Sequence, residues 1–338
     1  IPVWAIPGNH DSPERIAYGG KMMEKAGIFM SRVFDGTLRT YIMRRFSDGI
    51  VEIKEREDCG QEDSGREVRE QVEISLLPFL RPAQVRKFYP EKTIDTTQQA
   101  VEAVLEKEEC SGSSVRILLM HQFVAGAVVC ESEEISVGGS DQVDVSVMDN
   151  FDYVALGHLH RPQKVGRESV RYCGSPLKYS FSEADHEKTI TVVETVQDQE
   201  TDCRMEGNTD RSGRKRVRVD TIPLIPKLDL REIRGPMNQL LQPAVYRAAN
   251  PEDYLHVTLT DEEEILDAIG KLREVYPNIM KLDFLTGSAS VVDETEIQVE
   301  EKTPEQLFEE FFLKQNGREM NEVQKRVVRE IWKGCDTE

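Results

Sequence analysis

The sequence lacks any CxxC pair, and its six cysteines are spread singly over 338 residues. This spacing does not form the disulfide framework of a small secreted domain. We therefore expect free thiols in a reducing compartment, and hence a cytoplasmic protein.

Long apolar runs are also missing. No stretch approaches the length of a membrane span, and no secretory signal opens the sequence, so we expect no membrane contact. With 338 residues, of which 38% are hydrophobic, the chain suits two or three folded domains. Ile1 already lies in an expected strand, so we expect further residues to precede it.

An excess of basic over acidic residues is absent as well. The formal net charge of -19 at pH 7 argues against a uniformly basic surface for nucleic acid. Between Pro251 and Glu310, 17 acidic and 4 basic residues contribute -13 of this charge. The region around the histidines is closer to neutral, so local binding of phosphate stays possible.

Hydrophobic periodicity and turn residues predict alternating strands and helices. Strands are expected at 2–7, 37–46, 50–54, 72–77, 115–120, 153–157, 188–196, 254–259 and 279–285. Helices are expected at 14–25, 96–109, 262–276, 304–315 and 321–332. Ser12 followed by proline predicts the start of the first helix, and residues 47–49 (Ser-Asp-Gly) predict a hairpin turn.

The strand around residue 155 ends in a glycine and two histidines, in the order Tyr-Val-Ala-Leu-Gly-His-Leu-His from 153 to 160. His158 and His160 share one face because they are two residues apart in extended chain. Two neutral imidazoles offered together suit a transition-metal ion. The alternative is a pair of hydrogen-bonded loop histidines.

Two other expected strands end in the same way. Asn9 and His10 follow the strand at 2–7, and His121 follows the strand at 115–120. An asparagine carbonyl is a hard oxygen ligand, and His10 can supply a proton or hold a phosphate oxygen. The alternative for Asn9 is a local turn, where asparagine is common.

An asparagine and several histidines at strand ends suit a site for two divalent metals. Such metals lie about 4 Å apart and clamp the attacking and leaving oxygens of a phosphoryl ester. Mixed nitrogen and oxygen ligands favour Mn²⁺, Fe²⁺ or Zn²⁺ over Mg²⁺. The site also needs carboxylates, and none stands as plainly at a strand end.

Three motifs resemble the later motifs of calcineurin-like metallophosphoesterases: Gly-Asn-His-Asp at 8–11, His121, and Gly-His-Leu-His at 157–160. The longer segments 8–15, 172–181 and 254–261 resemble the SbcD family of bacterial nuclease subunits. The likeness covers nearly the whole chain except about 55–70 and 197–215. It implies an α/β fold with a β-sandwich flanked by helices, a small α/β capping domain and C-terminal helices.

The resemblance also implies residue roles. Asn9, His121 and His158 would bind one metal and His160 the other, with Mn²⁺ as the expected ion, and His10 would contact the scissile phosphate. Three basic residues are expected to contact the DNA: Arg15, Arg161 and Lys164. For the basic residues after His160, an ordinary solvated hairpin is an equal alternative.

The family's first two metal motifs, an Asp-x-His and a Gly-Asp-x-x-Asp, are absent from the sequence. They supply the remaining ligands, including the bridging aspartate. We therefore expect a chain shortened at its N-terminus and nearly inactive by itself.

The expected domains are a nuclease domain at 1–216, a capping domain that positions DNA at 217–293, and a linker with partner-binding helices at 294–338. Apolar residues of the first tail helix share one face: Leu307, Phe308, Phe311 and Phe312. With the resemblance added, this face is expected to dock on an SbcC-like ATPase; the alternative is packing on its own domain.

The implied activity is that of a DNA exonuclease and single-strand or hairpin endonuclease in repair, recombination and replication. It would act as a homodimer within a heterotetramer. Two alternatives stay open: another calcineurin-like phosphoesterase acting on nucleotides or phosphoproteins, and a non-catalytic subunit that only binds its partner.

Overall fold

A computed structural model describes residues 1–58, 65–106, 114–130, 133, 141–196, 216–261, 263, 265–285, 306, 308–309, 311–313 and 319–335. The chain divides into two compact units, Ile1–Leu285 and Thr286–Glu338. Each unit is described separately below. The expected loop at 197–215 and the linker at 294–302 lie outside the described residues.

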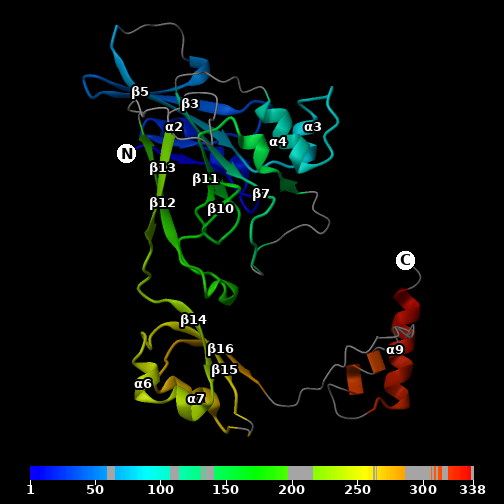
Figure 1. The fold of residues 1–338 in the computed structure, drawn as a ribbon. Coiled ribbons are helices and arrows are strands. Elements are labelled where there is room, and N and C mark those ends of the chain that lie inside the picture. Colours follow the sequence, from blue (N-terminus) through cyan, green and yellow to red (C-terminus); the bar gives the residue numbers. More distant parts are fainter. Residues whose placement is uncertain are drawn as a thin grey trace, which may run out of the picture. The chain divides into compact units, whose positions relative to one another are not determined.

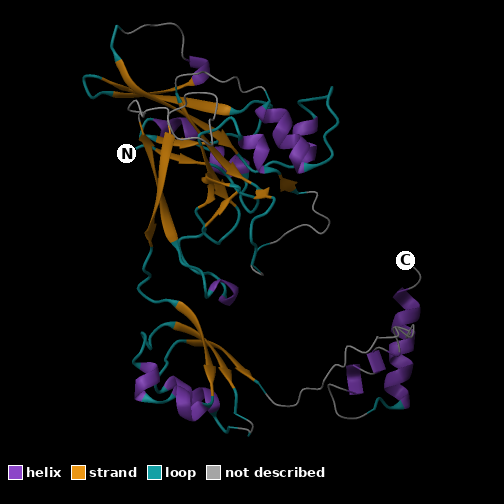
Figure 2. Ribbon diagram, in the orientation of Figure 1, coloured by secondary structure: helices purple, strands orange, loops and turns teal. Residues whose placement is uncertain are grey.

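A seven-stranded mixed sheet forms the centre of the first unit, in the order β10-β11-β9-β6-β5-β3-β4 (Figures 1 and 2). The four strands β11, β9, β6 and β5 run parallel, and β10, β3 and β4 pair antiparallel at the edges. The bounds are β3 Arg39–Phe46, β4 Val51–Glu55, β5 Val68–Leu77, β6 Val115–His121, β9 Tyr153–Gly157, β10 Gln163–Val165 and β11 Arg167–Tyr172. The predicted hairpin at 47–49 is confirmed, with Gly49 at φ 84°.

Alternate residues of the central strands enter two different cores. Leu118 and Met120 of β6 pack with helix α4 (Thr97–Leu105) on one face. Val115 faces the other core, where Phe29 belongs to the small parallel pair β1 (Val3–Ala5) and β2 (Ile28–Met30). Because both faces are covered, the parallel strands read as nearly continuous apolar runs.

Helix α4 begins with a capping box, in which the Thr96 hydroxyl accepts from the backbone N–H of Gln99. The short helix α3 (Pro82–Arg86) precedes it, and both lie on the same side of the sheet (Figure 1). The remaining short elements are η1 Arg56–Asp58, β7 Phe123–Val124, β8 Gln142–Val143, η2 Val145–Met148 and η3 Phe181–Glu183.

The single helix predicted at 14–25 is wrong, because the segment forms two short helices. These are α1 (Pro13–Ala17) and α2 (Gly20–Glu24). Gly19 between them adopts φ 77°, a left-handed conformation that ends a helix at little cost only for glycine. The predicted start is confirmed: Ser12 caps α1 and proline occupies its first position.

A smaller α/β module follows, with the parallel sheet β14 (Leu230–Gly235), β15 (Tyr254–Leu259) and β16 (Ile279–Phe284). Its core lies against helices α5 (Met237–Leu240), α6 (Pro243–Tyr246) and α7 (Ala268–Arg273). The helix predicted at 262–276 is therefore much shorter, because it begins only after Asp267, whose side chain accepts from the N–H of Gly270.

A two-stranded ribbon connects the sheet to this module. Strand β13 (Arg216–Pro223) pairs with β12 (Thr189–Val196) along its whole length. This pairing crosses the domain boundary expected between residues 216 and 217. The division into nuclease and capping domains stays a prediction.

The second unit contains α9 (Glu322–Cys335) and the helical residues Gln306, Phe308, Glu309 and 311–313. Lys325 of α9 pairs with Glu309 at 3.3 Å. Among the described residues, no helix combines the length and apolar character needed to cross a membrane.

Candidate metal centre

Three polar side chains meet at the strand ends. Asn9 Oδ1 lies 3.0 Å from His121 Nε2 and 3.3 Å from His158 Nδ1. His121 is the last residue of β6, and His158 directly follows β9, its parallel neighbour. Carboxyl ends of parallel strands are where open α/β sheets place their sites.

The donor atoms are spaced as ligands of one metal ion would be. Two atoms about 2.1 Å from a metal, at angles between 90° and tetrahedral, lie about 3.0–3.4 Å apart. The observed separations of 3.0 and 3.3 Å fall in this range. A direct hydrogen bond between an imidazole N–H and the asparagine oxygen gives the same spacing, so the distances fit a metal without requiring one.

Both imidazoles are held in the neutral form that a metal requires. Burial, reinforced by the neighbouring His158, lowers the pKa of His121 to about 4. Burial likewise lowers the pKa of His158, against the opposing charge of Glu133. Near neutral pH each ring therefore keeps a nitrogen lone pair available for coordination.

Two glycines make room for the His121 ring. A Cβ at Gly8 would lie 2.6 Å from His121 Cε1, and one at Gly157 would lie 2.7 Å from its Nδ1. The ring is packed between the backbones of two different strand ends, while His158 itself adopts φ 111°. The glycines in the two motifs thus have a steric purpose at the centre.

Replacing Gly8 with alanine is expected to weaken Mn²⁺ binding at these donors by about 10- to 100-fold, the usual effect of disturbing a ligand's support. The added methyl group would displace His121 from Asn9. Isothermal titration with Mn²⁺ measures the change. Gly20→Ala is the control, because nothing lies within 4 Å of its Cβ. Equal affinity in both variants would contradict the prediction.

His160 lies in a different set of contacts. Its Nδ1 is 2.8 Å from Glu183 Oε1, and its backbone N–H donates to Glu133. Glu183 is fully buried and also accepts from Lys188 at 2.7 Å. A carboxylate on Nδ1 fixes the tautomer that presents Nε2, as in many metal-binding histidines.

The sequence patterns do not reveal the carboxylates near the histidines, because neither carboxylate follows the end of a strand. Glu183 is 23 residues from His160 along the chain and Glu133 is 27. Within the described ranges, no three His, Cys, Asp or Glu side chains group in a way that could hold an ion. The expected role of His160 at a second metal stays a prediction.

The other predicted site residues are His10, Arg15, Lys164 and Arg161. His10 is exposed, and its charge acts on both His121 and His158. Arg15 lies on α1, and Lys164 pairs with Glu168 at 2.9 Å on the exposed hairpin of β10 and β11. This ion pair agrees with the alternative that Lys164 belongs to an ordinary solvated hairpin and does not contact DNA.

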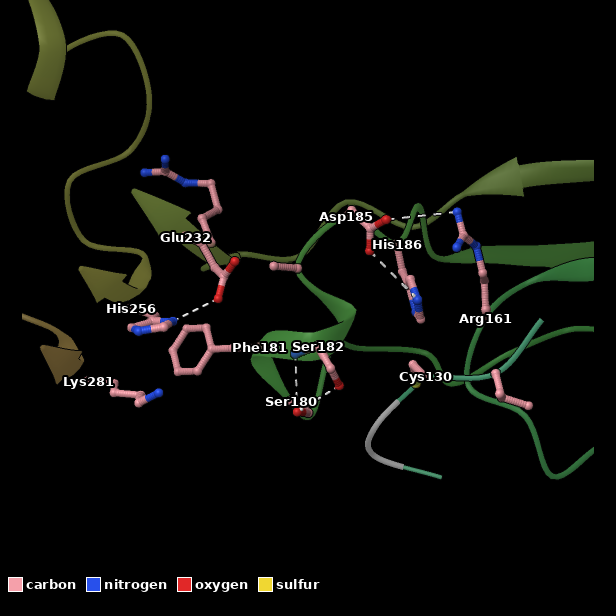
Figure 3. A pocket seen from close by; sticks show the side chains of 13 residues that line it. Cys130, Arg161, Ser180, Phe181, Ser182, Asp185, His186, Glu232, His256 and Lys281 are labelled. Carbon is pink, nitrogen blue, oxygen red and sulfur yellow. Dashed lines mark hydrogen bonds and ion pairs between the residues drawn. The ribbon is translucent and has the colours of Figure 1, made fainter. Parts of the chain in front are cut away.

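Arg161 lines a cavity of about 1040 Å³ and lies 3.9 Å from Asp185 (Figure 3). Glu232, His256 and Lys281 of the small module lie on the other wall, with Phe181 between them and the Arg161 side. Arg161 therefore faces the space between the large sheet's loops and the small module.

The segment after β5 also belongs to the site, although the sequence patterns do not single it out. Phe79 packs edge-on against His121, with ring centroids 6.1 Å apart. Its backbone N–H donates to the carbonyl of Pro7, just before Asn9. A signal for it exists in the sequence, because this segment follows an apolar strand as the histidines do.

The sequence of this chain is similar to those of known proteins. Residues 226–316 match the family described as the type 5 capsule protein repressor C-terminal domain, SbcD_C. The chain is 28% identical over 338 residues to the SbcD subunit of the SbcCD nuclease of Staphylococcus epidermidis, in a match that covers 98% of this chain and 78% of that protein. The large mixed sheet with its helices is consistent with a metallophosphoesterase fold. The chain is therefore similar to the SbcD nuclease subunit over nearly its whole length.

Proposed function

We propose that the protein is a metal-dependent DNA nuclease subunit that hydrolyses phosphodiester bonds. The observation that carries the proposal is the meeting of Asn9, His121 and His158, 3.0 and 3.3 Å apart, in a chain related to a nuclease subunit over 98% of its length. DNA is the proposed substrate and Mn²⁺ the proposed ion.

Asn9, His121 and His158 would hold one divalent ion, and His160, oriented by Glu183, would serve a second. A bound ion polarises a phosphoryl oxygen and lowers the pKa of bound water. The exposed His10 would contact the scissile phosphate and hold a proton for the leaving oxygen. Burial keeps His121 and His158 from taking that proton themselves, since it lowers the pKa of both.

The test measures both the binding of Mn²⁺ and the cleavage of DNA. Mn²⁺ binding is measured calorimetrically on this chain, and cleavage of end-labelled single- and double-stranded DNA is measured on the complete gene product. We expect Mn²⁺ to bind and cleavage to stop when a chelator removes it. Cleavage that continues in chelator, or no binding of Mn²⁺, would contradict the proposal.

A second role is supported by the relative from Staphylococcus epidermidis, which is one subunit of SbcCD. We propose an SbcC-like ATPase as the partner, within a heterotetramer that contains two copies of this chain, acting in DNA repair and recombination in the cytoplasm. The docking surface is the first tail helix. Phe308 and Phe311 are exposed there, with ring centroids 6.3 Å apart, whereas Leu307 lies outside the described residues.

Replacing Phe308 and Phe311 with alanine is expected to weaken the complex with the ATPase by about 2–4 kcal/mol, the scale of aromatic anchors at interfaces. The unfolding of residues 1–285 should not change, because the helix belongs to the other unit. Surface plasmon resonance and thermal melting measure the two effects. Phe284→Ala, an exposed aromatic of the first unit, is the control. An unfolded first unit with intact ATPase binding would refute this assignment.

A further inference from the structure

A cavity of about 550 Å³ adjoins the metal centre, on the side of α3 and α4. It shares Asn9 and His158 with the donor set, and its volume lies within the roughly 300–1,000 Å³ usual for small-ligand sites. Its wall contains apolar and polar side chains: Phe79, Leu80, Pro82, Phe123, Arg81, Thr97, Gln122 and Asp141.

Arg81 is the basic residue of this wall. It is exposed, and no ion pair of its guanidinium is found among the described residues. The guanidinium lies over the Phe79 ring, 5.8 Å from its centroid. A guanidinium stacked on an aromatic face keeps its N–H donors directed outward for a planar or tetrahedral oxyanion.

The backbone that carries Arg81 is fixed relative to the metal donors. Besides the bond from Phe79 to Pro7 described above, the buried Gln122 side chain donates to the carbonyl of Leu80 at 3.0 Å. Gln122 is the residue after His121. The segment 79–81 is therefore tied to two of the three strand ends that supply the proposed metal donors, those of β1 and β6.

The wall carries one acidic and one basic side chain, Asp141 and Arg81. Asp141 is half-buried, and its charge acts on His158. An anion that enters the cavity is repelled by Asp141 and attracted by Arg81. The apolar residues of the same wall suit an uncharged sugar or base.

We propose that this cavity takes the nucleotide next to the scissile bond and that Arg81 binds its other phosphate. The inference rests on the proposed nuclease function and adds a substrate subsite to it. Arg81 would hold the strand in register, so that the phosphate to be cleaved lies beside Asn9 and His158. It forms a charge-assisted contact that neutral DNA analogues would not make.

The test is binding of a fluorescein-labelled oligodeoxythymidylate by anisotropy over a range of salt, without divalent cations, so that the strand stays intact. Arg81→Ala is expected to bind about tenfold more weakly, with a slope of log affinity against log salt smaller by about 0.7. Arg81→Lys should recover the slope, because it restores one charge. Lys87→Ala is the matched control, since Lys87 lies over Phe88 at 5.0 Å and does not line the cavity.

Thermal melting separates binding from folding, and the exposed Arg81 should be replaceable without loss of stability. If Arg81→Ala binds the oligonucleotide like the wild type, with the same salt slope, the subsite is wrong while the nuclease function stands. If Lys87→Ala loses as much affinity for the oligonucleotide as Arg81→Ala, the loss reflects the lower positive charge of the protein in general. The proposed subsite is then also wrong. A wild-type chain that binds no oligonucleotide would overturn both proposals.

Discussion

Replacing His10 with alanine is expected to slow metal-dependent DNA cleavage by about 100- to 10,000-fold, the range for loss of a general acid. Bound metal should be retained. His10 is exposed, whereas the proposed donors Asn9, His121 and His158 contact one another without it. It nevertheless directly follows Asn9 in the chain, which keeps it beside the centre.

Cleavage is measured on the complete gene product, and Mn²⁺ affinity is measured by calorimetry on the same preparation. His121→Ala is the matched comparison, because it should lose both cleavage and metal. If His10→Ala empties a metal site to the same degree as His121→Ala, then His10 is a ligand and its proposed contact with phosphate is wrong.

The strand ends could be predicted from the sequence because two signals coincide there. The apolar run at 115–120 must enter a covered sheet, and the polar histidine that follows must lie at the end of that strand. Parallel pairing then brings His121 and Gly157 directly opposite each other. Local pattern thus indicated that His121 and His158 would lie at neighbouring strand ends, whereas the contact of both with Asn9 required the structure.

The surroundings of His160 could not be predicted in this way. Glu183 lies in a short 3-10 turn and Lys188 just before β12, and neither position follows a helical or strand period. Their contact depends on how the loop 173–188 folds over the end of β9. Similarly, the break at Gly19 depends on one backbone conformation that an amphipathic pattern does not reveal.

The ion pair beneath His160 gives the second large expected effect. Glu183 and Lys188 have side chains 0% and 4% exposed, and their charged atoms lie 2.7 Å apart. Lys188 also donates to the His160 carbonyl and to the Ser175 hydroxyl, each at 2.8 Å. The pair therefore ties three segments together in a place that water does not reach.

Burial by itself would raise the pKa of Glu183, but hydrogen bonds and charge from Lys188 and His160 lower it to about 2. Since the folded value lies below the ordinary 4.5, ionised Glu183 stabilises the fold above pH 4.5. This contribution is lost as the pH falls toward 2. The difference in stability between wild type and Glu183→Gln should shrink over the same interval.

Replacing Lys188 with methionine is expected to lower the free energy of unfolding by about 3–5 kcal/mol, because it leaves a buried carboxylate without its main partner. Urea unfolding at pH 7 measures the loss. Adding Glu183→Gln to the same chain should recover part of it, since the uncompensated charge is then removed. Lys164→Met is the matched control: Lys164 is 63% exposed beside Glu168, and its loss should cost less than about 1 kcal/mol. Equal effects of the two methionine substitutions would show that the buried pair does not stabilise this loop.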